Sequence, residues 1–354
     1  MINKKIRIAI LAPMVYTVPP KKQGGTEWIV YHQANGLVER GYDVTLFALR
    51  GSKTKAHLVA LPHKGMADVR LFLAKIEGSR RLRMETVFIT HLISELLKRK
   101  DRFDLIFNHI RGGEVLVPLV PLFKAPIIHV LHLPIFKELA ELFRKYKTPL
   151  VSISNNQKKV APDLNYLATI YNCVDTEVFA FNPRPDDYYF TIGTIGEHKD
   201  PYLAVEAARK SGLKLILAGR MRDEKYFEGK IKPYLGRKIK YLGEIGLREK
   251  LKYFQKARAL VFTPNWSEPF GLVMIEAMSC GTPVIATRHG AVPEVVKDGV
   301  TGFIVDDLKS LIEAIKKIDS IDRLACRQRV ERKFTVQKMI DKYEGVIKKT
   351  LNLP

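Results

Sequence analysis

The carboxylates Glu268 and Glu276 are separated by seven residues, and their surroundings suit side chains that bind a ligand. Pro269 and Gly271 interrupt regular structure, so Glu268 is predicted to lie in a loop and a short helix to begin near Gly271. Glu276 is then the one charged residue of an otherwise apolar, buried helix. An unpaired carboxylate there costs on the order of several kcal/mol unless donors satisfy it, and a pair of sugar hydroxyls would do so.

Backbone amides at the start of that helix form a second predicted binding element. The N–H groups of Phe270, Gly271 and Leu272 would lack intrahelical partners and suit phosphate oxygens or hydroxyls. Two structural alternatives stay open. A neighbouring backbone group or arginine could pair with Glu276, and Glu268 could simply cap the helix.

Gly24 and Gly25 follow the first predicted strand and precede a helix that begins near Thr26. Glycines allow close backbone approach, and a helix N-terminus favours anions, so a diphosphate or a sugar could rest against this loop. An ordinary tight turn is the alternative.

Histidines and cysteines give no metal or disulfide pattern. His129 and His132 have the spacing of metal ligands, but no third ligand accompanies them. The three cysteines, at positions 173, 280 and 326, are odd in number and lack C-x-x-C spacing, so neither a zinc site nor a disulfide framework is predicted. This cysteine usage favours a reducing, cytoplasmic compartment.

The elements that position these residues alternate between buried strands and amphipathic helices. In the first half the predicted strands are 6–12, 44–48, 105–107, 127–131 and 150–153, with a clear helix at 26–40. After residue 175 the pattern resumes, with strands 190–195, 213–218, 239–242, 259–263 and 283–286, and helices 204–210, 247–256 and 272–279. This alternation predicts an α/β protein of two Rossmann-like domains that face each other across a shared cleft.

We place an N-terminal domain at residues 1–165 and a C-terminal domain at 166–333. The turn-rich stretch 182–187 has no periodicity, so the hinge is expected between about 155 and 185. Residues 334–354 have amphipathic helical spacing and are predicted to form a separate C-terminal helix.

The net charge of the chain excludes fewer classes of binding partner than its motifs do. The chain carries 59 Lys and Arg against 37 Asp and Glu, a net charge of +22 over 354 residues. Nucleic acid, an anionic membrane surface and a negatively charged small molecule are all compatible with it. Much of the charge lies in runs with helical spacing, such as 80–83, 98–102 and 323–333, which are typical of solvated helix faces. No stretch approaches about 18 consecutive apolar residues, so no spanning helix is predicted.

The segment from Glu268 to Glu276, with the following motifs at 277–284, 290–294 and 298–303, resembles the EX7E signature of retaining GT-B glycosyltransferases of family 4. Segments 24–27, 40–45 and 171–175 extend the resemblance over nearly the whole chain. It implies a nucleotide-diphosphate sugar as donor, with UDP the commonest nucleotide. The resemblance also implies that the C-terminal domain mainly binds this donor, that the N-terminal domain mainly binds the acceptor, and that residues 334–354 pack back on the N-terminal domain. It further implies no cofactor and no obligatory metal.

The resemblance also implies roles for individual residues. Glu276 would bind the ribose hydroxyls of the donor, while Glu268 and the amides of residues 270–272 would hold the donor sugar. Gly24 and Gly25 would lie against the donor. His109, at the end of the strand 105–107, is similar to the family position that contacts the donor sugar near the reacting carbon. A strand-end histidine with a purely structural role is the alternative.

Lys199 matches a lysine that neutralises the departing diphosphate, but Thr194 stands where the family has an arginine. Without a metal, cations must stabilise the charge of the leaving group, so this replacement should affect the rate. Our hypothesis is that Arg220, which follows the strand 213–218, partly replaces the missing charge. A solvated loop arginine is the alternative.

The sequence thus predicts a retaining hexosyltransferase with an unidentified acceptor hydroxyl, on a lipid-linked sugar, another sugar or a small molecule. An epimerase would lack the EX7E pattern, and a phosphorylase would need a pyridoxal-phosphate lysine motif that we do not find. The alternative from another class is a catalytically decayed GT-B protein that binds polyanions or a membrane surface, motivated by the charge and by Thr194. No motif supports specific nucleic-acid binding. Basic helices would allow peripheral contact with the anionic inner face of a membrane.

Overall fold

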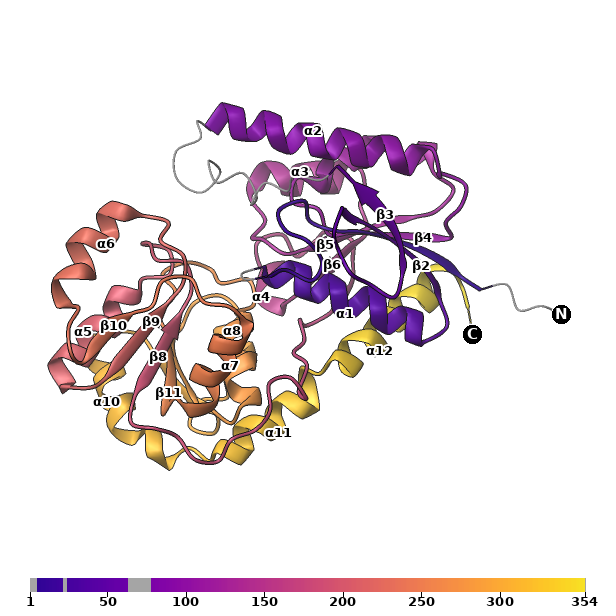
Figure 1. Cartoon of the computed structure of the whole chain (residues 1–354). Coiled ribbons are helices and arrows are strands. Elements are labelled where there is room, and N and C mark those ends of the chain that lie inside the picture. The colour runs from indigo at the N-terminus through magenta and orange to yellow at the C-terminus, as the bar shows by residue number, and fades with distance from the viewer. Residues whose placement is uncertain (1–4, 22–23, 63–77, 354) are drawn as a thin grey trace. The chain divides into compact units, whose positions relative to one another are not determined.

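A computed structural model describes residues 5–21, 24–62 and 78–353 of the chain. It divides into two units. Unit 1 comprises Met1–Ile153, Gln157–Ile170 and Val336–Pro354, and unit 2 comprises Ser154–Asn156 and Tyr171–Thr335. Each unit is an α/β sandwich around a parallel sheet, as the alternating pattern predicts (Figure 1). Among the described residues, no helix is long and apolar enough to cross a membrane.

The sheet of unit 1 has the strand order β3-β2-β1-β4-β5-β6-β7 within the described residues. Its strands are β1 (Arg7–Leu11), β2 (Asp43–Leu49), β3 (His57–Leu61), β4 (Leu105–Asn108), β5 (Ile127–Leu131), β6 (Leu150–Ser152) and β7 (Tyr166–Thr169). Its helices are α1 (Gly25–Glu39), α2 (Gly78–Leu97), the 3-10 helix η2 (Gly113–Leu122), α3 (Lys137–Lys145), α4 (Asn155–Lys158, which begins in unit 2) and α12 (Val336–Thr350).

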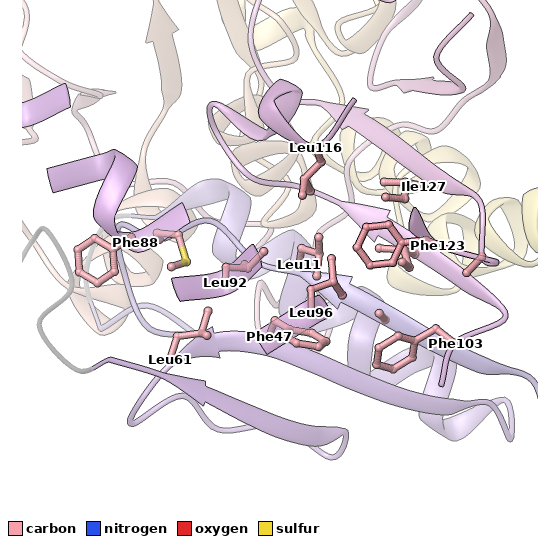
Figure 2. Packing of buried hydrophobic residues seen from close by; sticks show 14 of the residues in the cluster. Leu11, Phe47, Leu61, Phe88, Leu92, Leu96, Phe103, Leu116, Phe123 and Ile127 are labelled. Carbon is pink, nitrogen blue, oxygen red and sulfur yellow. The ribbon is translucent and has the colours of Figure 1, made fainter. Parts of the chain in front are cut away.

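The core of unit 1 lies on both faces of this sheet. Figure 2 shows the side that α2 covers, where Phe88, Leu92 and Leu96 of α2 pack on Leu11 and Phe47. On the other face α12 packs beside α1. There the ring of Tyr343 from α12 meets Phe107 of β4 edge-on, with 5.2 Å between ring centres. The C-terminal helix is therefore part of unit 1.

The sheet of unit 2 has the order β10-β9-β8-β11-β12-β13. Its strands are β8 (Tyr189–Ile192), β9 (Leu215–Ala218), β10 (Ile239–Tyr241), β11 (Ala259–Phe262), β12 (Val284–Thr287) and β13 (Gly302–Val305). Its helices are α5 (Pro201–Ser211), α6 (Glu224–Lys230), η3 (Lys232–Tyr234), α7 (Leu247–Lys256), α8 (Leu272–Ser279), α9 (Val292–Val295), α10 (Leu308–Lys317), η4 (Ile318–Ser320) and α11 (Arg323–Lys333). Helices α7 and α11 pack against α8, and α5 packs against α10 (Figure 1).

Both sheets reverse their strand order at a central pair of strands, β1 beside β4 in unit 1 and β8 beside β11 in unit 2. The two loops that leave such a pair diverge in opposite directions, which opens a crevice at the carboxyl ends of the strands. In unit 2 these loops carry Lys199, after β8, and Glu268, after β11. The topology thus brings together two predicted site residues that are 69 positions apart in the chain.

Candidate functional site

The loop between β11 and α8 is fixed by its glycine and its phenylalanine. Gly271 has φ +82°, and a Cβ atom there would lie 2.5 Å from Cε of Met274. The buried ring of Phe270 packs between Tyr171 and Phe334, with ring centres 6.0 and 5.9 Å away. These contacts hold the first turn of α8, so that the amides of residues 270–272 lie at the helix N-terminus as predicted.

Glu268 lies in this loop and pairs with a lysine. Its Oε2 atom accepts hydrogen bonds from Nζ of Lys199 and, at 2.9 Å, from Nε1 of Trp266. The side chains of Lys199 and Glu268 are 20% and 8% exposed. Nζ of Lys199 also lies over the rings of Trp266 and Phe262, 5.1 and 5.4 Å from their centres. Both donors contact the same oxygen, so Oε1 is the oxygen of Glu268 that can accept from a ligand.

The backbone of Glu268 is held by the loop that follows β12. The amide of Ala291 donates to the carbonyl of Glu268 at 2.8 Å. Gly290 has φ +61°, and a Cβ atom on it would lie 2.2 Å from both the nitrogen and the carbonyl oxygen of Glu268. Only glycine fits this close approach, so the loop after β12 fixes the position of the Glu268 backbone and of the carboxylate attached to it.

Glu276 lies inside α8 and also pairs with a lysine. Nζ of Lys250, on α7, donates to Oε1 of Glu276 at 2.6 Å, and the side chains are 19% and 12% exposed. The Oε2 atom of Glu276 is buried and has no hydrogen-bond partner among the described residues. The structural partner of Glu276 is thus Lys250, and not the backbone group or arginine that the sequence suggests as alternatives.

Thr194 and His198 lie in the loop after β8. Nε2 of His198 lies 3.0 Å from Oγ1 of Thr194, and the imidazole meets the Trp266 ring edge-on. Burial lowers the pKa of His198 to about 4, with further contributions from the positive charges of Arg222 and Lys199. His198 is therefore neutral at neutral pH, and Thr194 interacts with it rather than supplying a charge of its own.

Arg220 follows β9 and lies against the same loop. The carbonyl of Arg220 accepts from the amide of Ile195 at 2.9 Å. Gly219 makes this approach possible, because a Cβ atom there would lie 1.7 Å from the carbonyl oxygen of Gly193. The Nε atom of Arg220 is buried without a hydrogen-bond partner among the described residues. The backbone of Arg220 thus adjoins the residue that follows Thr194.

The predicted glycines of unit 1 precede and begin α1. Gly24 has φ +144°, and a Cβ atom on it would lie 2.7 Å from Cβ of Pro20 and 2.9 Å from Oε2 of Glu27. Gly25 is the first residue of α1 and is exposed. Burial raises the pKa of Glu27 to about 7, although backbone N–H groups of Glu27 and Tyr16 donate to it. The helix begins one residue before the predicted start.

His109 directly follows β4 in unit 1 and is buried. Its Nδ1 lies 2.9 Å from Nε2 of His132, and its own Nε2 is buried without a partner among the described residues. Burial lowers the pKa of His109 well below the usual range, and the neighbouring His132 lowers it further. His129 instead contacts Nδ2 of Asn108 at 3.1 Å. His129 and His132 therefore have different partners, and the described residues contain no group of three His, Cys, Asp or Glu that could hold a metal ion.

The predicted site residues thus fall into two groups. Unit 2 brings Lys199 into contact with Glu268, and places Glu276 on the helix whose N-terminus follows Glu268. In unit 1, Gly24 and His109 follow the neighbouring strands β1 and β4. Lys250 and Trp266, which donate hydrogen bonds to the two glutamates, were not predicted from the sequence. No spacing signal links either residue to its glutamate partner, apart from the position of Trp266 two residues before Glu268.

Comparisons with known proteins relate the chain to glycosyltransferases. The family described as "Glycosyl transferases group 1" matches residues 175–332, and "Glycosyltransferase Family 4" matches residues 23–178. A D-inositol 3-phosphate glycosyltransferase of Mycolicibacterium smegmatis is 25% identical over 355 residues, covering 85% of this chain and 80% of the relative.

Solved structures share the fold at lower identity. The sucrose-phosphate synthase of Thermosynechococcus elongatus superposes with a TM-score of 0.79 at 19% identity, over 98% of this chain and all of the other. The Anabaena protein HepE, solved in complex with UDP and glucose, superposes with a TM-score of 0.73 at 16% identity, over 97% of this chain and all of the other.

Proposed function

We propose that this chain, which has the GT-B fold and is similar to glycosyltransferases of family 4, transfers a hexose, with retention, from a nucleotide-diphosphate sugar to an acceptor hydroxyl. The observation that carries the proposal is the pair of glutamates on one loop and the helix that follows it, Glu268 before α8 and Glu276 within α8. Each carboxylate has one oxygen bound by a lysine. Each can therefore accept from a hydroxyl through the other oxygen.

The proposed donor-binding roles follow from the carboxylate oxygens that the two lysines do not contact. Oε2 of Glu276 accepts from a ribose hydroxyl, which removes the cost of a buried acceptor without a partner. Oε1 of Glu268 accepts from a hydroxyl of the donor sugar. UDP is the proposed nucleotide, because the structurally similar HepE was solved with UDP and glucose. The acceptor carries at least one free hydroxyl.

In the proposed reaction the acceptor oxygen bonds to the anomeric carbon on the face from which the diphosphate departs. The bond between that carbon and the diphosphate breaks, and its electron pair leaves with the diphosphate, which gains negative charge. A phosphate oxygen of the leaving group takes up the proton of the acceptor hydroxyl. Lys199 stabilises this charge, because its ammonium has three N–H donors and Glu268 takes only one of them. Arg220 adds positive charge from the adjoining loop, and no metal is required.

The test of this proposal is the stereochemistry of sugar release. Purified protein with UDP-glucose is expected to release glucose slowly to water even without an acceptor, and NMR of the fresh product should show the α-anomer. Glu268→Gln should slow release at least about 100-fold, the range seen when a group that stabilises the transition state is removed. The β-anomer would contradict retention. No release from UDP-, GDP- or ADP-linked hexoses would favour the decayed alternative.

We further propose that α2 contacts an anionic membrane. The outer face of this helix exposes Leu82 and Val87, at 65% and 56%, beside the exposed Arg80 and Arg83. Apolar side chains flanked by cations suit the headgroup region of an anionic bilayer. Sedimentation with phosphatidylglycerol vesicles should fall in the Leu82→Ser, Val87→Ser double variant. It should be unchanged in Val160→Ser, an equally exposed valine outside α2. Equal binding by both variants would contradict the proposal.

A further inference from the structure

Lys250 is a lysine whose ammonium is directed at one carboxylate. It projects from α7, and its Nζ lies 2.6 Å from Oε1 of Glu276 and 5.3 Å from the ring centre of Phe179. The side chain is 19% exposed, whereas Lys252 and Lys256 of the same helix are exposed. An aromatic ring and a carboxylate thus restrict a side chain that is otherwise among the most mobile.

The pair leaves hydrogen-bonding groups of both kinds unused. Oε2 of Glu276 is a buried acceptor without a partner in the described part of the chain. The ammonium of Lys250 has three N–H groups, and Oε1 of Glu276 accepts one of them. The pair therefore presents an acceptor and a donor at adjacent positions. A vicinal diol has the complementary arrangement, because each hydroxyl both donates and accepts.

We propose that Lys250 positions Glu276 and, together with it, determines specificity for the ribose diol of the nucleotide. The proposal rests on the proposed function, in which Glu276 contacts that ribose. Lys250 fixes the carboxylate through Oε1 so that Oε2 accepts from one hydroxyl, and an N–H of the ammonium donates to the oxygen of the other. A nucleotide without these hydroxyls leaves both groups unsatisfied.

A purely structural ion pair between α7 and α8 makes a different prediction. Such a pair would change stability when broken, and any loss of affinity would be the same for all nucleotides. The proposed role instead couples Lys250 to the ribose hydroxyls. The difference in affinity between nucleotides with and without the ribose diol therefore distinguishes the two roles, because a purely structural ion pair would leave that difference unchanged.

The experiment is a calorimetric titration of the full chain with UDP and with 2′,3′-dideoxy-UDP. If GDP or ADP binds instead, the matching dideoxy analogue is used. The wild type is expected to bind the dideoxy nucleotide at least about tenfold more weakly, as for loss of hydrogen bonds to charged groups. Lys250→Met should bind UDP roughly tenfold more weakly, with dideoxy-UDP nearly unaffected, so that discrimination falls below about threefold.

Two further variants complete the test. Lys250→Arg keeps the charge and should retain most of the discrimination, and Lys250→Gln replaces the methionine variant if that does not fold. Lys252→Met, an exposed lysine of the same helix, is the matched control and should behave as wild type. Undiminished discrimination in Lys250→Met would overturn the inference while leaving the proposed function intact. A wild type that binds none of UDP, GDP and ADP would overturn both.

Discussion

The ion pair between Lys199 and Glu268 predicts a specific pattern of stability losses. Lys199→Met would leave the carboxylate, which is 8% exposed, with Trp266 as its remaining donor. Removing one member of a fully buried pair costs about 3–5 kcal/mol, and of an exposed pair about 1 kcal/mol or less. Lys199 is 20% exposed, so we expect a loss of about 2 kcal/mol.

A double-mutant cycle isolates this pair. Glu268→Gln keeps the shape and an acceptor for Trp266, and should cost about 1 kcal/mol. The variant with both substitutions has no unpaired charge, so its loss should be smaller than the sum by about 1–2 kcal/mol. Urea unfolding followed by Trp266 fluorescence measures each value. The chain contains two tryptophans, and a Trp28→Phe background with selective tryptophan excitation leaves Trp266 as the only tryptophan observed. Additive losses within about 0.5 kcal/mol would refute the pairing.

Two more predictions concern packing and pH. Gly290→Ala should lower the free energy of unfolding by about 1–3 kcal/mol and weaken nucleotide binding, because its Cβ would collide with the Glu268 backbone. The control Gly236→Ala has open space around the new Cβ and should be nearly neutral. Equal shifts in melting temperature for the two variants would contradict this prediction. Burial lowers the pKa of His129 to about 4, from about 6.5 in the unfolded state. Between these two pH values the unfolded state binds more protons than the folded state. The free energy of unfolding therefore falls as the pH drops from about 6.5 to about 4, by up to about 3 kcal/mol. Urea midpoints against pH should show this slope reduced in His129→Asn, and an unchanged slope would exclude His129 as its source.

The fold was predictable where strands are buried on both faces. The central strands β1, β4, β8 and β11 consist mostly of apolar residues, and α7 and α8 have the predicted bounds. Three of the four edge strands, β3, β7 and β13, were not predicted, whereas the fourth, β10, was. An edge strand is less buried, so its sequence lacks the continuous apolar run that identifies a central strand. The burial pattern of β3, which is largely exposed, illustrates this.

The candidate site was predictable only in part. A parallel sheet places loops at the carboxyl ends of its strands, and this explains why Lys199 and Glu268 meet after β8 and β11. The contact between Lys250 and Glu276 depends instead on the packing of α7 against α8, which no local pattern encodes. Thr194 was identified as a departure from the family pattern, but its hydrogen bond with His198 is a tertiary detail of the loop.

The most direct test of the account is calorimetric titration with UDP, GDP and ADP, comparing the wild type with Glu276→Ala. The account predicts saturable binding of one nucleotide by the wild type. It predicts a loss of at least about tenfold in Glu276→Ala, because the ribose hydroxyls lose a charged acceptor. The matched control is Glu249→Ala on α7, a glutamate that contacts the backbone of Gly246 and not the site. Equal affinity in wild type and Glu276→Ala would contradict the assignment of this carboxylate to the nucleotide.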